Sequence, residues 1–140
     1  MNKFDSLIKY LPMLEDGAVG AWIFDRRNDG TPEHPITMPF VNYSETVYSF
    51  IEDIYEFADK NKEYGLTHYR DILMSNGIEW GNRSMREADV SSADAKCILA
   101  LLVAAVRAER FCEGLLLSFF KDGSIKKWLE RLKELESEVK

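Results

Sequence analysis

The sequence predicts a mostly helical α+β protein, with about five helices around one central apolar helix and one two-stranded β-hairpin. The central helix is indicated by residues 97–106, an apolar run of ten residues within a longer helical pattern. The hairpin is indicated by two short apolar stretches that flank Asn28-Asp29-Gly30 and two prolines. A chain of 140 residues has the usual length of one compact domain, so residues 1–140 are expected to form a single domain.

The N-terminal helix is predicted over residues 4–14, where apolar side chains recur at helical spacing. Pro12 interrupts this pattern. Because proline lacks an amide donor, the helix is expected to bend or restart there.

The two strands of the hairpin are predicted over residues 18–25 and 36–41. Both alternating faces of the first stretch are apolar, as in a strand that is covered on both sides. The second stretch contains Pro39, which cannot donate a ladder hydrogen bond, so this strand is expected at an edge.

The rest of the chain is expected to be almost entirely helical. An amphipathic pattern over residues 45–60 predicts one helix, and Ser44 is its expected N-cap. Ser92 is the expected N-cap of the long central helix. Further helices are predicted over residues 67–74, 93–112, 115–120 and 124–139, with a polar loop over residues 81–90.

Composition excludes several classes of protein. There are 24 Asp and Glu against 18 Lys and Arg, so the net charge is −6, and a nucleic-acid partner is not expected. No apolar run approaches the roughly 20 residues of a membrane span, and no signal peptide is recognised, so we expect a cytoplasmic protein without a membrane partner. Cys97 and Cys112 lie roughly 22 Å apart if their helix is continuous, which is too far for a disulfide.

A charge cluster follows the central apolar run and gives the first candidate binding residues: Arg107, Glu109, Arg110 and Glu113. Arg110 is expected to pair with Glu113 one turn later. Two interpretations stay open. The two guanidinium groups form a site for a small anionic ligand, or the four side chains form a structural ion-pair network, which is the more frequent case. Trp80, near a loop, is a further candidate that can wall a pocket or belong to the core.

An acidic helix face gives the candidate metal ligands. Glu52, Glu56 and Asp59 recur at helical spacing, and carboxylate oxygens of this kind can hold a divalent cation. A face of like charges is more often simply solvated. The sequence contains no zinc-ligand spacing, phosphate-binding glycine loop or nucleophile–base motif, so we expect no resident metal or cofactor and identify no catalytic residue.

The last helix carries an apolar stripe that includes Trp128, Leu132 and Val139. Such a stripe usually faces the core, but it can also recruit a partner helix or a second copy of the chain. A homodimer is therefore one arrangement that the sequence allows.

Three segments resemble a known family. Arg107-Ala108-Glu109-Arg110-Phe111-Cys112-Glu113-Gly114 is similar to the R-x-E-R-F-x-x-G signature of an uncharacterised bacterial family, domain of unknown function 6508. Leu11-Pro12-Met13-Leu14-Glu15 resembles its L-P-x-L-E opening, and Phe120 to Ile125 its F-x-x-G-x-I element. Trp80 stands where members of the family tend to carry a tryptophan. The resemblance implies a bacterial intracellular domain and supplies no activity.

Taken together, these features favour a non-enzymatic binding or protein-interaction domain. The alternative is a metal-dependent hydrolase of a small phosphorylated or nucleotide substrate. In that protein the acidic helix would hold Mg²⁺, and Arg107 or Arg110 would hold phosphate. The alternative requires the acidic face and the arginines to face each other across one cleft.

Overall fold

The computed structural model describes residues 4–14, 20–23, 40–80, 82–91 and 93–138. Helices dominate this part of the chain, as predicted, and they are more numerous than the five expected. In chain order the elements are α1 (Asp5–Ile8), α2 (Leu11–Leu14), β1 (Gly20–Ile23), β2 (Phe40–Tyr43), α3 (Glu45–Lys60), α4 (Tyr69–Ser75), α5 (Asn82–Glu87), α6 (Ala95–Ala108), α7 (Leu115–Lys121) and α8 (Ser124–Glu138). Two single 3-10 turns, Lys62–Tyr64 and Leu66–His68, connect α3 to α4.

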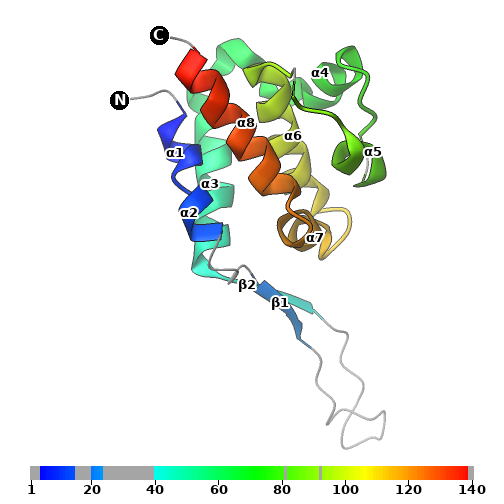
Figure 1. Ribbon diagram of the computed structural model, residues 1–140. Helices are drawn as coiled ribbons and strands as arrows, with labels where there is room; N and C mark the ends of the chain where they lie inside the picture. The colour runs from blue at the N-terminus through cyan, green and yellow to red at the C-terminus, as the bar shows by residue number, and fades with distance from the viewer. Residues whose placement is uncertain (1–3, 15–19, 24–39, 81, 92, 139–140) are drawn as a thin grey trace, which may run out of the picture.

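The core is built around α6, which confirms its prediction as the central apolar helix. Every residue from Cys97 to Val106 is buried. The helix packs against α3, α4, α7 and α8, and Figure 1 shows it enclosed by them. A helix that is apolar on all sides is stable only in such a place, because no face of it gains from contact with water.

The ends of α6 differ from the prediction. The N-cap is Asp94, whose carboxylate accepts a hydrogen bond from the amide of Cys97 at 2.8 Å, while Ser92 lies outside the described residues. The helix ends at Ala108 and does not continue to Cys112. The chain tightens there, since the amide of Arg110 donates to the carbonyl of Arg107, three residues back.

The N-terminal segment breaks before Pro12, between Ile8 and Leu11. Proline is tolerated in the first turn of a helix, where its missing amide leaves no intrahelical hydrogen bond unmade. Asp53 of α3 receives both the hydroxyl of Tyr10 and, at 3.1 Å, the ammonium group of Lys9. These contacts fix the short helices on α3.

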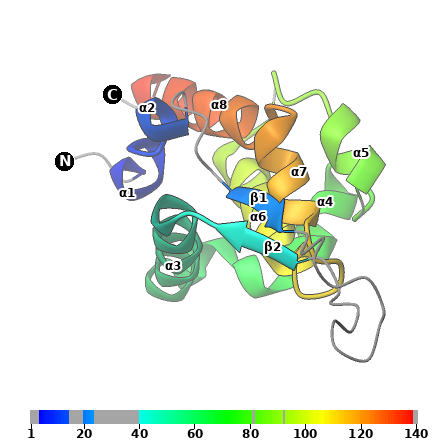
Figure 2. The same cartoon turned by 90° about the horizontal axis from the view of Figure 1, so that it is seen from below.

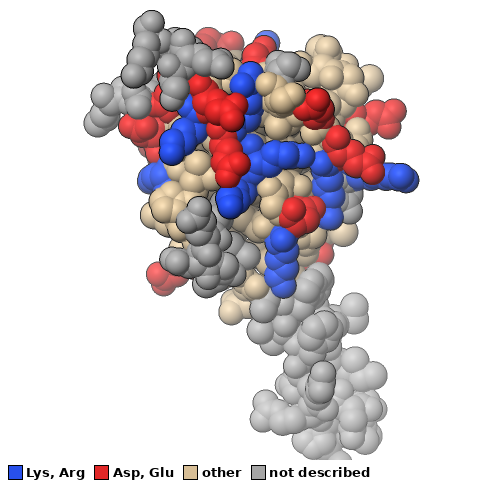
Figure 3. All heavy atoms as spheres, in the orientation of Figure 1, with Lys and Arg blue, Asp and Glu red and all other residues tan. Residues whose placement is uncertain are grey.

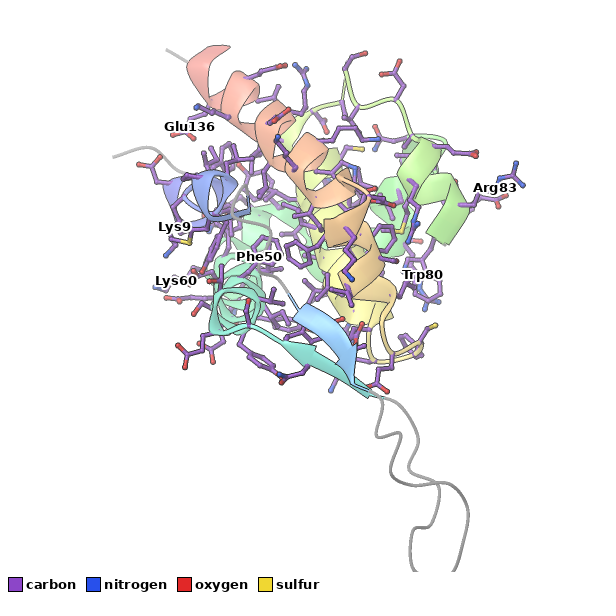
Figure 4. The ribbon with its side chains drawn as sticks, turned by 60° about the horizontal axis from the view of Figure 1, so that its bottom comes forward. Lys9, Phe50, Lys60, Trp80, Arg83 and Glu136 are labelled. Carbon is purple, nitrogen blue, oxygen red and sulfur yellow. The ribbon has the colours of Figure 1, made fainter. Side chains whose placement is uncertain are left out.

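Helix α3 spans the predicted residues and begins at the predicted cap, where the Ser44 hydroxyl accepts from the amide of Val47 at 3.4 Å. Its inner face carries four buried residues, Val47, Phe50, Ile54 and Phe57. Phe50 points into the core and lies 5.4 Å, centroid to centroid, from the ring of Phe120, whereas Lys60 points outward (Figure 4).

Strands β1 and β2 pair antiparallel, with Gly20 opposite Tyr43 and Ile23 opposite Phe40. They lie under the end of α6, next to α7 (Figure 2). The second strand begins at Phe40, so most of the range predicted for it, 36–41, lies outside the described residues. The connection over residues 24–39 also lies outside them, so the hairpin as a unit stays a prediction.

The polar loop predicted over residues 81–90 is wrong in part, because α5 occupies Asn82–Glu87. Met85 anchors this helix in the core, and Arg83 pairs with Glu87 one turn later at 3.2 Å. Lys127 of α8 donates to the carbonyl oxygens of Arg86 and Ala88 at 3.0 and 3.3 Å, which satisfies groups left free at the end of α5. Overall polarity concealed this helix, because one buried side chain, Met85, and polar contacts with α7 and α8 hold it.

The apolar stripe of α8 faces the core. Its members Ile125, Trp128, Leu129 and Leu132 are completely buried. Lys, Arg, Asp and Glu side chains are mixed over the outward face of the molecule that carries α8 (Figure 3). These four residues are therefore not free to receive a partner helix or a second copy, and Val139 lies outside the described residues. None of the helices in the described ranges is both long enough and apolar enough to cross a bilayer.

Candidate functional site

The carboxylate of Glu109 organises the turn between α6 and α7. Its oxygens accept hydrogen bonds from the amide of Gly114 at 3.0 and 3.1 Å and from the amide of Leu116 at 3.1 Å. These amides stand at the start of α7, where a helix leaves its first donors unpaired. Gly114 has a φ of +91°, a left-handed backbone conformation that favours glycine. Glu109 therefore serves as an acceptor for the beginning of the next helix.

The hydroxyl of Tyr43 joins strand β2 to the same carboxylate. It donates to Glu109 at 2.7 Å and accepts from the amide of Leu117 at 3.0 Å. Burial raises the pKa of Tyr43 well above its ordinary value, and the hydrogen bond to Glu109 raises it further. The phenol is therefore neutral at physiological pH and keeps both hydrogen bonds.

Glu113 makes a second connection to the strand. Its carboxylate accepts from the amide of Val41 in β2 at 3.1 Å. The expected ion pair between Arg110 and Glu113 is absent from the described part of the chain, and so is any other ion pair among residues 107–113. The two glutamates instead bind backbone amides and a phenol, which hold β2 against the turn.

The two arginines point elsewhere. The guanidinium group of Arg107, which is half-buried, lies 5.9 Å from the ring centroid of Tyr69 in α4. Its Nε atom is buried and has no hydrogen-bond partner among the described residues. Arg110 is exposed. Within the described residues neither arginine has a carboxylate partner, so their charges are not neutralised by the fold.

Trp80 completes a cluster with residues from three segments. The guanidinium group of Arg70 in α4 lies 4.2 Å from the centroid of the indole, and the ring of Phe111 packs edge-on at 5.8 Å. Arg70 also lies 6.0 Å from the centroid of Tyr69. Figure 4 places Trp80 at the edge of the molecule, beside α5. We call Tyr69, Arg70, Trp80, Arg107 and Phe111 the arginine–aromatic cluster.

The outer boundary of the arginine–aromatic cluster is open to solvent. Phe111 is 69% exposed although it is a large apolar residue. It follows Arg107 by four residues, and the amide of Phe111 still donates to the carbonyl of Ala108 at 3.0 Å, so Arg107 and Phe111 stand one turn apart. Met74, also 69% exposed, follows Arg70 by the same spacing on α4. Exposed apolar and cationic side chains thus alternate on this surface.

The structure brings together some of the predicted site residues and separates others. Trp80 and Arg107 belong to the arginine–aromatic cluster, and Arg110 adjoins Phe111 in the turn. Glu109 and Glu113 support the turn from the strand side. Tyr69 and Arg70 were missed, because their position in α4 carries no pattern that relates them to Trp80 or to the end of α6.

The acidic face of α3 does not assemble a metal centre in the described part of the structure. Glu52, Glu56 and Asp59 are exposed, and Glu56 pairs with Lys60. Lys60 lies on the opposite side of the molecule from Trp80 (Figure 4). No group of three His, Cys, Asp or Glu side chains that could hold a metal ion is present among the described residues. The arrangement that the hydrolase alternative requires, with Glu56 facing the arginines, is therefore not found.

Asp59 instead borders a shallow cavity of about 390 Å³ between α3 and the 3-10 turns. Its walls include Tyr55, Lys62, Leu66 and Thr67. Acidic and basic groups face each other across it, which gives the cavity no net preference for either sign of ligand.

Both cysteines are free, as predicted from their separation. Cys97 is buried in α6, and Cys112 is exposed in the turn. Burial raises the pKa of the Cys97 thiol to about 11. This thiol is protonated and shielded, so it has no nucleophilic role in the folded protein.

The described structure is that of a small helical protein in which a buried apolar helix, α6, ends in a turn that carries the exposed residues Arg110 and Phe111. The chain belongs to the family of unknown function (DUF6508), whose model matches residues 1–138. Membership of this family confirms the resemblance found in the sequence. No curated protein and no solved structure matches the chain.

Proposed function

We propose that this protein is a non-enzymatic binding protein that recognises its partner through the arginine–aromatic cluster and the adjoining Arg110. One observation carries the proposal: Phe111 is 69% exposed, yet it is held edge-on against Trp80, which Arg70 covers. Large aromatic side chains and arginine are enriched at the centres of protein interfaces. Here they occur together on one surface.

The support given by Glu109 and Glu113 fits this function. They hold the turn that carries Arg110 and Phe111 against β2 through hydrogen bonds to backbone amides. A recognition surface needs a fixed backbone, because each side chain ordered on binding weakens the affinity. The predicted binding residues therefore divide into contacting and positioning groups.

The remaining properties of the proposal follow from the sequence. We place the protein in the bacterial cytoplasm, where its two free thiols fit a reducing compartment. We treat it as a single domain without a cofactor. We expect a homodimer, where one forms, to use the arginine–aromatic cluster and not the buried stripe of α8.

The test compares three tagged proteins as baits in a lysate of the native host: the unchanged chain, Phe111→Ser and Tyr55→Ser. Tyr55 is a matched control, an exposed aromatic residue of α3. Proteins retained by the unchanged chain and by Tyr55→Ser should be reduced about tenfold with Phe111→Ser, the equivalent of about 1.4 kcal/mol of binding free energy. Equal retention by all three baits, measured by quantitative mass spectrometry, would show that the arginine–aromatic cluster is not the binding surface.

A further inference from the structure

The arginine–aromatic cluster carries positive charge that the fold does not balance. Arg70 and Arg107 lie over aromatic rings, Arg110 faces solvent, and none of the three forms an ion pair within the described residues. This is unusual in a chain whose net charge is −6. The acidic residues nearest in sequence to Arg107 and Arg110 are Glu109 and Glu113, which are occupied with backbone amides and Tyr43. Asp71 and Glu79, which adjoin Arg70 and Trp80 in sequence, are exposed and form no ion pair with Arg70 within the described residues.

Two hydrogen-bond donors of the arginine–aromatic cluster have no acceptor. Arg107 Nε and Trp80 Nε1 are both buried, and neither has a hydrogen-bond partner in the described structure. Both atoms can only donate, so the group that pairs with them is an oxygen acceptor, and because both atoms are buried a ligand reaches them only when neighbouring side chains shift. A carboxylate supplies two oxygens and a negative charge, and it fits the planar fork of a guanidinium group.

A ligand that neutralises the arginines must also cover apolar surface. Phe111 and Met74 are each 69% exposed beside the arginines. A small inorganic anion would leave this apolar surface in water. A nucleic acid would bring a phosphate charge with every nucleotide and no aliphatic side chain to cover Phe111 and Met74. A polypeptide can present carboxylates and apolar side chains together.

We propose that the occupant of the arginine–aromatic cluster is an acidic polypeptide segment, with carboxylates bound by Arg107 and Arg110 and an apolar side chain packed on Phe111. This inference rests on the proposed function and specifies the chemistry of the partner. Arg70 is itself exposed, and its guanidinium group covers the indole of Trp80 and keeps it in place for the contact with Phe111.

The test uses two immobilised pools of degenerate hexapeptides. The acidic pool has Asp or Glu at four positions and Leu, Ile, Phe or Trp at two, and the control pool has Asn or Gln in place of the acids. The acidic pool should retain about tenfold more protein than the amide pool, and the difference should shrink as salt is raised. Equal retention by the two pools would overturn the inference.

Variants identify the site. Arg110→Gln and Phe111→Ser replace exposed side chains, so both should keep the fold, and each should reduce retention on the acidic pool about tenfold. Lys126→Gln removes the same charge from α8 and should change nothing. A loss with Lys126→Gln equal to that with Arg110→Gln would mean that binding depends on net charge and not on the arginine–aromatic cluster, which would also overturn the inference.

Other occupants give distinct outcomes. Stronger retention on immobilised single-stranded oligouridylate than on the acidic pool would assign the arginine–aromatic cluster to RNA. Self-association that Phe111→Ser abolishes, measured by sedimentation velocity without peptide binding, would assign it to a second copy. If the acidic pool fails while Phe111-dependent capture from lysate persists, the partner chemistry is wrong and the proposed function stands. If both fail, the proposed function is wrong as well.

Discussion

Both carboxylate oxygens of Glu109 accept hydrogen bonds from the single amide of Gly114, five residues further along the chain. This contact closes the turn between α6 and α7. It also explains why Glu109, at the end of an apolar helix, has no basic partner among the described residues: backbone amides and the Tyr43 hydroxyl use its hydrogen-bonding capacity.

Replacing Glu109 should destabilise the protein strongly. Glu109→Ala leaves the amides of Gly114 and Leu116 and the hydroxyl of Tyr43 without an acceptor, so the free energy of unfolding should fall by about 3 kcal/mol. Glu109→Gln keeps one acceptor oxygen and should lose less. Arg110→Ala should stay within about 0.5 kcal/mol of the unchanged protein, since Arg110 is exposed. Urea denaturation measures all three, and a larger loss for Arg110→Ala than for Glu109→Ala would contradict this assignment.

Stability should decline in alkaline solution because of Tyr43. The pKa of Tyr43 is raised in the folded protein above its ordinary value of about 10, first by burial and then by its hydrogen bond to Glu109. The unfolded chain therefore releases this proton at lower pH than the folded protein does. The stabilisation is fully present below about pH 10 and is lost as the pH rises above it.

Tyr43→Phe tests that relation. The variant should be less stable at neutral pH, because the hydroxyl links Glu109 to the amide of Leu117. Its stability should fall less steeply above about pH 10 than that of the unchanged protein. Tyr10, whose pKa is also raised by burial and by Asp53, contributes to the remaining slope. Denaturation midpoints measured at several pH values would refute the relation if both proteins showed the same slope.

We expect Arg86 to make the contacts that contribute most to holding α5 against α7. Its guanidinium group pairs with Asp122 at 2.9 Å, reaches the hydroxyl of Ser118 and lies 4.9 Å from the ring centroid of Phe119. Arg86→Ala should lower the free energy of unfolding by about 1 to 2 kcal/mol and increase hydrogen exchange in α5. Arg86→Lys should recover only part of this loss, because an ammonium group cannot stack on the ring. Arg83→Ala, on the exposed side of the same helix, is the control and should leave exchange unchanged.

The two thiols should differ sharply in reactivity. Cys112 is exposed and should react with iodoacetamide at about pH 8, whereas Cys97 is buried and its pKa is raised to about 11. Intact mass should show a single adduct on the folded protein and a second after addition of urea. Cys112→Ser should abolish the first adduct. Rapid double labelling of the folded protein would mean that α6 opens readily.

Periodicity and capping predicted the elements that depend on local sequence. The apolar run of α6, the amphipathic face of α3 and the hydroxyl cap of Ser44 were all readable, because each follows from residues within a few turns. Helix α5 escaped prediction because one buried residue, Met85, and contacts with α7 and α8 hold it. Local polarity gave no sign of those contacts.

The contacts of the candidate site residues were only partly predictable, because they too join residues that are far apart in the sequence. The sequence singled out Arg107, Arg110 and Trp80 as candidates, but it paired Arg110 with Glu113, and this ion pair is absent from the described part of the chain. The carboxylates of Glu109 and Glu113 instead accept hydrogen bonds from Tyr43 and Val41 of β2, which lie 66 and 72 residues earlier in the chain. The contact of Arg70 with Trp80 depends on how the chain folds back after α4, and that of Arg107 with Tyr69 on how α4 is placed on α6. No spacing rule along one helix can find such pairs.

The hydrogen bonds between Glu109 and Gly114, at the two ends of the turn, have an energetic consequence. Phe111 and Arg110 lie between Glu109 and Gly114, so one carboxylate ties both ends of the stretch that displays them. Residues 109–114 become ordered when the protein folds. They would therefore lose little further conformational entropy on binding a ligand. Tyr43 and Val41 in turn connect this stretch to β2 through their hydrogen bonds to Glu109 and Glu113. Under the proposed function, binding would therefore be linked thermodynamically to β2, and we expect fraying of β2 to weaken it even when every contacting side chain is intact.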